Sequence, residues 1–277
     1  WSSDVCSSDL YRKMLRQNEL LREKGNGRFR DLMVAVAQDP AMLVYLDAGA
    51  NRKGAPNENF AREIMEMFTL GVGHYTETDI REAARAFTGW DVEQMKFVVR
   101  REHQDDGVKR VLGREGRFGG EDVIDILLAQ PAAANYLSAR LYRYFVREEI
   151  SPALQQRLSA VLRGSDYDIG AFLETLFLSR DFHSPASVAT RIKPPVELVV
   201  STYRKAGVKR IPGIPDFNEI TASLGQKLFY PPTVAGWPTG RTWITPGLLI
   251  ARGNFVYETI YPDVYFVPHD RVPPGNF

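Results

Sequence analysis

Two consecutive helical patterns between residues 57 and 90 constrain the fold of this chain more than any other feature. The first, over 57–70, places its apolar side chains on one broad face at about 3.6 residues per turn, and Gly71 ends it. The second begins at Thr76, where a hydroxyl and an acid three residues later resemble a capping box, and it ends near Gly89. Two amphipathic helices joined by a short turn predict helix-on-helix packing.

Charged side chains form a stripe on each of these helices. The two stripes are Glu58, Arg62 and Glu66 on the first helix, and Glu77, Arg81 and Arg85 on the second. In one interpretation both stripes are solvated surfaces whose intrahelical ion pairs each contribute about 0.2–0.5 kcal/mol. In the other, the first stripe docks against the arginines of the second helix and lines a cleft. Because desolvation offsets the attraction within a buried network, such a cleft would indicate function rather than stability.

The rest of the chain predicts an all-α fold with little sheet. Further helical patterns run from residue 11 to 46 and from 121 to 257. Short β-like runs flank the turn signal Asp106-Gly107 and predict one small β-hairpin over about 95–112. We therefore expect about ten helices, mostly in antiparallel pairs.

The two ends of the chain differ from its middle. Residues 1–10 (WSSDVCSSDL) precede the first helical pattern, contain the only cysteine and are interpreted as a non-native leader. We expect a single helical domain over 11–260, as a fragment of a longer protein, followed by an extended tail over 261–277 that is rich in proline and aromatic residues. Without the leader the chain has no cysteine, which excludes disulfides and thiolate metal sites.

Composition and motifs exclude several functional classes. The formal net charge of +1 gives no strong attraction to nucleic acid or to an anionic membrane surface. No apolar run approaches the roughly 18 residues of a membrane-spanning helix. The chain has no Walker loop, no Gly-x-Ser-x-Gly elbow and no dinucleotide-binding turn after a strand, so the sequence predicts no cofactor.

The acids of the first helix are candidates for acid–base chemistry. Carboxylates three residues apart on a helix, such as Glu63 and Glu66, lie close enough to share a site, as the two carboxyl groups of a hydrolase do. The alternative is an ordinary helix surface, where such pairs are common. The catalytic candidates are Glu58, Arg62, Glu63, Glu66, Arg81 and Arg85.

A metal site and an aromatic binding surface are weighed in the same way. His103, Asp105 and Asp106 offer ligands suited to calcium or magnesium, but Asp-Asp-Gly is also ordinary turn chemistry, and we expect no metal there. The candidate binding residues are aromatic side chains with one arginine, which suit a glycan or a partner chain: Trp90, Trp237, Arg241 and Trp243. Alternatively, the two later tryptophans fix the proline-rich loop that contains them onto the helices.

Four segments of the chain, 39–47, 51–90, 103–113 and 224–255, resemble the bacterial family catalogued as domain of unknown function 1800. The resemblance covers about residues 11–255, and 57–90 is its most specific part. It implies a mostly helical bacterial protein that is exported to the periplasm or the cell exterior, with the signal region missing from this fragment. It also implies a second exported protein, similar to sulfatases, as a partner. It implies no catalytic residues.

Two functions follow as expectations. The first is an exported helical binding or assembly component that acts with a partner protein at the cell envelope. The second is an envelope hydrolase, with a polysaccharide as its substrate, that uses a Glu/Arg cleft formed by the helix pair at 57–90.

Overall fold

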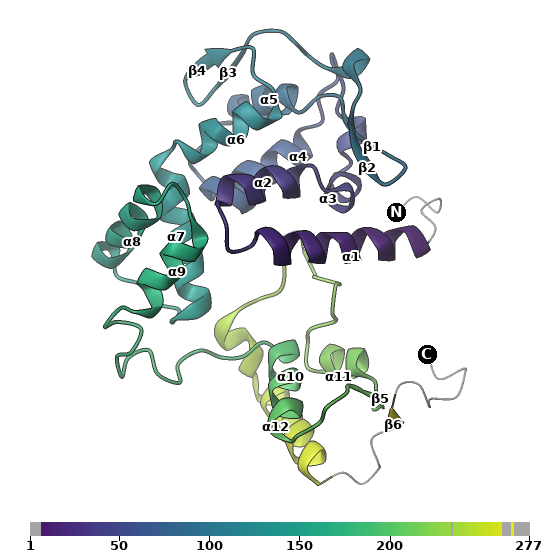
Figure 1. Ribbon diagram of the computed structural model, residues 1–277, viewed down its shortest axis with the longest axis vertical. Coiled ribbons are helices and arrows are strands. Elements are labelled where there is room, and N and C mark those ends of the chain that lie inside the picture. The colour runs from purple at the N-terminus through teal and green to yellow at the C-terminus, as the bar shows by residue number, and fades with distance from the viewer. Residues whose placement is uncertain (1–6, 234, 262–266, 269–277) are drawn as a thin grey trace. The chain divides into compact units, whose positions relative to one another are not determined.

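The computed structural model describes residues 7–233, 235–261 and 267–268 (Figure 1). The described chain is mostly helical, with twelve α-helices and three small antiparallel two-stranded sheets, which confirms the predicted helical character. It packs as two compact units that divide between Ser184 and Pro185, where the sequence predicts one domain over 11–260. Each unit is described by itself.

Unit 1 contains nine helices among its described residues. They are α1 (Ser7–Lys24), α2 (Phe29–Ala37), α3 (Pro40–Tyr45), α4 (Glu58–Glu63), α5 (Glu77–Ala86), α6 (Gly120–Leu128), α7 (Pro131–Phe145), α8 (Pro152–Gly164) and α9 (Ile169–Phe177). Helix α1 begins within the predicted leader 1–10, of which residues 1–6 lie outside the described part of the chain. Helices α7 and α8 lie side by side, as do α4 and α5 (Figure 1).

Caps fix where the two helices of the 57–90 segment begin. The side chain of Asn57 accepts a hydrogen bond from the backbone N–H of Asn59 at the start of α4. Thr76 and Asp79 form the reciprocal capping box at the start of α5, as the sequence predicts. Because these caps satisfy N–H groups that have no partner inside the helix, they stabilise both helix starts.

Helix α4 continues directly into a π-helix, η2 (Ile64–Leu70), which the sequence does not predict. The hydroxyl of Thr69 donates to the carbonyl oxygen of Ile64, five residues earlier, at 2.7 Å. The carbonyl oxygen of Met67 accepts hydrogen bonds from Tyr136 and Arg140 on α7, at 3.0 and 3.1 Å. Side chains of η2 and α7 therefore satisfy carbonyl groups in the wider turn.

The core of unit 1 is built around aromatic rings from the 57–90 segment. The ring of Phe87 meets those of Phe60 and Trp90 edge to face, with centroids 5.1 Å apart in each pair. Trp90 meets Phe97 in the same way at 5.0 Å. All of these residues except the half-buried Phe97 are buried, and helix α6 approaches the rings through Gly120, which has no side chain.

Two hairpins take the place of the one predicted over 95–112. Their strands are β1 (Trp90–Glu93) with β2 (Lys96–Val99), and β3 (Lys109–Val111) with β4 (Arg114–Gly116). Each hairpin turns through two residues with positive φ, Gln94-Met95 and Leu112-Gly113, as type I′ turns require. The predicted pairing was wrong because only one of these four turn residues is a glycine, whereas Asp106-Gly107 lies in the loop between the hairpins.

Unit 2 contains three described helices and one sheet: α10 (Pro195–Lys205), α11 (Phe217–Ser223), α12 (Pro246–Ile260), and strands β5 (Pro212–Ile214) and β6 (Val267–Pro268). A short 3-10 helix, η4 (Gly240–Ile244), precedes α12, whose N-cap is Thr245. The core consists of Val199, Tyr203, Leu224 and Phe255. Of the predicted tail over 261–277, only Tyr261 and β6 lie within the described residues. No described helix is both long and apolar enough to span a membrane.

Candidate functional site

Ion pairs join helices α4 and α5 at the surface of unit 1. Arg62 donates to Glu77 at 2.6 Å and to Glu58 at 3.3 Å, and Arg81 reaches Glu58 at 3.4 Å. The hydrogen bond to Glu77 is the main reason that the pKa of Arg62 lies above its usual value. Arg62 and Glu58 are half-buried and the other two side chains are exposed, so each pair contributes only about 0.2–1 kcal/mol.

The predicted docking of the first charged stripe against the arginines of the second helix therefore occurs for only some of the residues. Glu58 meets Arg81 across the two helices, but Glu66 and Arg85 take other partners. The hydroxyl of Tyr75 donates to the carboxylate of Glu66. Burial, followed by this hydrogen bond to an acceptor, raises the pKa of Tyr75. Tyr75 thus occupies the place beside Glu66 where the sequence predicts an arginine.

Glu63 is the acid whose surroundings are the least ordinary. It is the last residue of α4, and its Oε2 atom is buried with no hydrogen-bond partner among the described residues. Burial is the main reason that the pKa of Glu63 is raised; the charge of Glu66 raises it further, and that of Arg62 opposes both. Raised pKa values keep a carboxyl group protonated at higher pH, which is the state that a general acid needs.

The junction between α4 and η2 thus places a poorly solvated acid beside a second carboxylate. Single π-helical turns within α-helices are rare and are often found at functional sites. Glu63 precedes the first residue of η2, and Glu66 lies within η2. The arrangement offers a proton donor and a carboxylate on adjacent turns, which are the two groups that acid–base hydrolysis requires.

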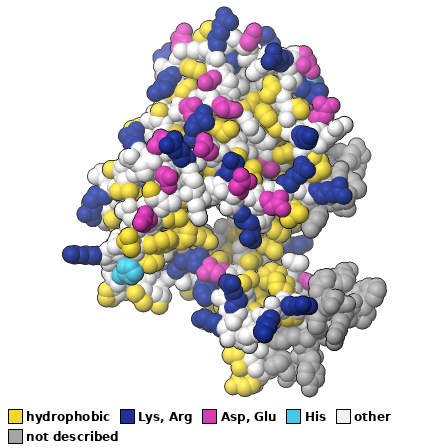
Figure 2. Space-filling view, in the orientation of Figure 1, with side chains coloured by type: hydrophobic (Ala, Val, Ile, Leu, Met, Phe, Trp, Pro, Cys, Tyr) yellow, Lys and Arg dark blue, Asp and Glu magenta, His cyan; other side chains and the backbone are white. Residues whose placement is uncertain are grey.

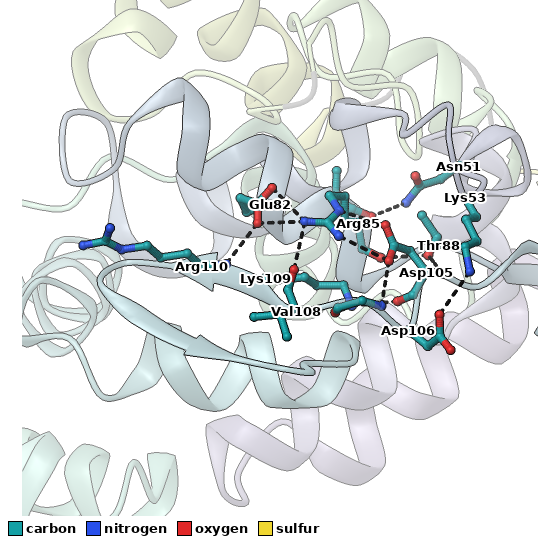
Figure 3. Close-up of polar contacts among 12 residues, drawn as sticks. Asn51, Lys53, Glu82, Arg85, Thr88, Asp105, Asp106, Val108, Lys109 and Arg110 are labelled. Atoms are coloured by element: carbon teal, nitrogen blue, oxygen red, sulfur yellow. Dashed lines mark hydrogen bonds and ion pairs between the residues drawn. The ribbon is translucent and has the colours of Figure 1, made fainter.

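Arg85 is the centre of a second polar cluster, drawn in Figure 3. Its guanidinium donates to both carboxylate oxygens of Glu82 at 3.0 Å and to those of Asp105 at 2.8 and 3.3 Å. It also reaches the carbonyl oxygen of Val108 at 3.1 Å. The hydrogen bond from Arg85 is the main reason that the pKa of Asp105 lies below its usual value. Arg85 therefore connects α5 to the loop between the hairpins.

The strand that follows this loop, β3, begins with a buried lysine. Lys109 is 2% exposed, and its ammonium group donates to the carbonyl oxygens of Asp105 and Gly107 at 2.6 and 3.0 Å. Burial lowers the pKa of Lys109. Because the acceptors are backbone carbonyls, this lysine fixes the path of the loop (Figure 3).

The residues considered for a metal site belong to this loop. Asp105 accepts hydrogen bonds from Arg85, and Asp106 pairs with Lys53 at 3.0 Å, while the carbonyl oxygen of His103 accepts from the backbone N–H of Lys53. Both carboxylates are thus neutralised by side-chain cations. No group of three potential metal ligands from His, Cys, Asp and Glu occurs among the described residues.

The four residues considered for an aromatic binding surface lie in different surroundings. Trp90 is buried in the core of unit 1, and its ring is unavailable for stacking on a ligand. In unit 2, Trp243 is buried in η4 close to Gly225, Trp237 is half-buried and Arg241 is exposed. The burial of Trp243 fits the alternative in which it holds the proline-rich loop onto the helices.

Large apolar side chains are exposed on α12, where the sequence predicts no site. Four of them, at 55–66% exposure, are Leu249, Ile250, Tyr257 and Ile260. Phe229 and Tyr230 are also exposed in unit 2. Figure 2 shows hydrophobic side chains at the surface around the C-terminal end of α12. The pattern of α12 signals this weakly, because its apolar residues are distributed around the whole helix instead of along one stripe.

The fold and these sites define a mostly helical protein of two compact units, with a π-helical acid site in the first and an exposed apolar helix in the second. The chain belongs to the family described as "Protein of unknown function (DUF1800)", which matches residues 2–272. This confirms the resemblance identified from the sequence. No curated protein and no solved structure matches the chain.

Proposed function

We propose that this chain is a non-catalytic binding component that docks a partner protein on the exposed apolar side chains of α12. The observation that carries the proposal is the exposure of Leu249, Ile250, Tyr257 and Ile260 on one fifteen-residue helix. Exposed apolar patches of this kind mark interaction sites, and aromatic side chains are enriched at their centres. The bacterial cell envelope as its location, and an exported protein similar to sulfatases as its partner, come from the family resemblance.

The charge of unit 2 favours an acidic partner over a second copy of this chain. Residues 185–261 contain nine basic side chains, Arg191, Lys193, Arg204, Lys205, Lys209, Arg210, Lys227, Arg241 and Arg252, against four acidic ones, Glu197, Asp216, Glu219 and Glu258. Two copies meeting through this unit would bring like charges together, whereas an acidic surface is attracted to it.

The test is a purification from the native host with the full-length protein tagged, followed by reconstitution of each candidate complex from two purified proteins. We expect one acidic partner whose Kd rises at least tenfold with Ile250→Asp or Tyr257→Asp. The matched control is Leu178→Asp, which places the same charge on an exposed apolar position of unit 1 and leaves the Kd unchanged. Equal binding by all variants, or self-association through α12 in light scattering, would overturn the proposal.

A hydrolase is the second candidate, and the raised pKa of Glu63 favours it. In this proposal the Glu63 carboxyl group protonates the leaving oxygen of a polysaccharide. Glu66, held by Tyr75, takes a proton from the water that forms the new bond to the sugar carbon. The test is release of reducing sugar from a panel of bacterial glycans by the purified chain. Activity that Glu63→Gln abolishes and Glu58→Gln retains would support it. The absence of any turnover would contradict it.

A further inference from the structure

Arg252 is a half-buried cation of unit 2 without an acidic partner among the described residues. It lies in the middle of α12, and its Nη2 atom donates to the backbone carbonyl oxygen of Lys193 at 2.7 Å. Its Nη1 atom is buried and has no hydrogen-bond partner among the described residues. Burial is the one cause that lowers the pKa of Arg252, with no opposing carboxylate. An arginine that is desolvated and unpaired is unfavourable unless an anion compensates it.

Lys193, whose backbone Arg252 contacts, lacks an acidic partner as well. Its ammonium group donates to the hydroxyl oxygen of Ser201 at 2.9 Å, and it makes no ion pair with a described residue. The nearest acid in the sequence, Glu197, is paired with Arg191 at 2.7 Å. The guanidinium of Arg252 therefore contacts the backbone of a lysine, and neither side chain has an acidic partner among the described residues.

The N-terminus of helix α10 lies close to Lys193 in the sequence and favours an anion there. Lys193 comes two residues before Pro195, the first residue of α10, where the helix dipole favours negative charge and disfavours a cation. The backbone N–H of Val196 already donates to the side chain of Gln226 at 2.9 Å. Side-chain donors, and not the free N–H groups of the helix, would therefore hold a ligand here.

We infer that Lys193 and Arg252 form a binding site for a tetrahedral oxyanion, a phosphate or sulfate group, with Ser201 positioning the Lys193 ammonium group. The planar guanidinium and the ammonium point charge are the two cationic donors that proteins use for such groups. The Ser201 hydroxyl donates to the carbonyl oxygen of Leu198 at 3.1 Å and accepts from Lys193, so it positions the ammonium group. A tetrahedral group has enough oxygen atoms to accept from both cations. The three side chains are half-buried, so part of the donor set is reachable from solvent. This inference goes beyond the proposed function, because it requires no partner protein.

The test measures ligand binding to the full chain by calorimetry and by thermal melting at constant ionic strength. The probes are inorganic phosphate, inorganic sulfate, acetate and chloride. We expect phosphate or sulfate to raise the Tm and to bind at one site, with no matching effect of acetate or chloride. Glucose 6-phosphate tests whether the ligand is a free ion or a phosphate group on a larger molecule. If glucose 6-phosphate binds, the site accepts a phosphate group that a larger molecule carries. If inorganic phosphate binds and glucose 6-phosphate does not, the ligand is the free ion.

Matched variants separate this site from general charge effects. Lys193→Gln and Arg252→Gln should each weaken binding at least tenfold, and two variants are used so that a folding defect in one leaves the other informative. Arg210→Gln removes a charge from an exposed position of the same unit and should bind as the wild type does. Equal responses to acetate and phosphate, or full binding by both site variants, would overturn the inference.

Discussion

The guanidinium of Arg85 holds the carboxylate of Asp105 through two hydrogen bonds, at 2.8 and 3.3 Å, across twenty residues of sequence. The same guanidinium contacts Glu82, so one side chain neutralises two acids. The pair connects α5 to the loop between the hairpins. Its role is architectural, because Glu82, Asp105 and the carbonyl oxygen of Val108, which accept from the Arg85 guanidinium, all lie within unit 1.

Arg85→Ala is expected to destabilise the protein by about 2 kcal/mol, because two partly buried carboxylates lose their hydrogen-bonded cation. Urea unfolding followed by circular dichroism measures this. The matched control, Arg81→Ala, removes an exposed arginine from the same helix and should cost about 0.5 kcal/mol or less. Equal losses in the two variants would contradict the role assigned to Arg85.

Acid should weaken the contact between Arg85 and Asp105. The pKa of Asp105 is lower in the folded protein than in the unfolded chain. Its stabilising contribution is therefore present above the unfolded pKa, near 3.8, and is lost as the pH falls through the folded pKa. Asp105→Asn should reduce stability at pH 7 and show a shallower loss of stability on acidification below about pH 4. Urea titrations between pH 7 and pH 2.5 check both slopes.

Glu63 should have the opposite pH dependence. Because its folded pKa is raised above the unfolded value, its protonated form stabilises the fold at low pH, and this contribution is lost as the pH rises through the folded pKa. Glu63→Gln keeps the shape of the side chain without the charge. We expect it to raise stability at pH 7 by about 1 kcal/mol and to leave it unchanged near pH 3. Glu58→Gln, on the same helix, is the control, and a loss of stability at pH 7 in Glu63→Gln would count against the prediction.

Gly120 should not tolerate a side chain. A Cβ atom there would lie 2.3 Å from the Trp90 ring and 2.6 Å from the Phe87 ring. Gly120→Ala must displace these rings and is expected to cost about 1–3 kcal/mol. Gly164→Ala is the control, since Gly164 is also helical and a Cβ atom there meets nothing within 4 Å. Gly164→Ala should have the stability of the wild type or exceed it by up to about 1 kcal/mol. Thermal melts of both variants measure the difference.

The helices were predictable because their signals are local. The capping box of Thr76 and Asp79 and the apolar spacing around Phe60 each require only a few neighbouring residues. A small hairpin in this region was predictable as well, but the pairing of its strands was not, because turns such as Gln94-Met95 adopt positive φ without a glycine. The burial of Trp90 depends on packing against Phe60, thirty residues earlier, and no local pattern indicates that contact.

The candidate sites were predictable in part. The sequence pointed to the acids of the 57–90 segment, but which of them is buried depends on the wider turn of η2, which a regular helical period does not contain. The environment of Arg252 depends on Lys193, fifty-nine residues away in the chain. Contacts of this kind arise only when the units fold, so residue spacing could not indicate them.

The hydrogen bonds between η2 and α7 also depend on the number of residues in the π-helical segment. Removing one residue from the segment 64–70 would return it to α-helical geometry and rotate the following residues by about 100°. The carbonyl oxygen of Met67 would then turn away from the donors Tyr136 and Arg140. A relative that is one residue shorter in this segment is therefore expected to have other residues at both of these α7 positions. A deletion in one helix would then be accompanied by two substitutions in another.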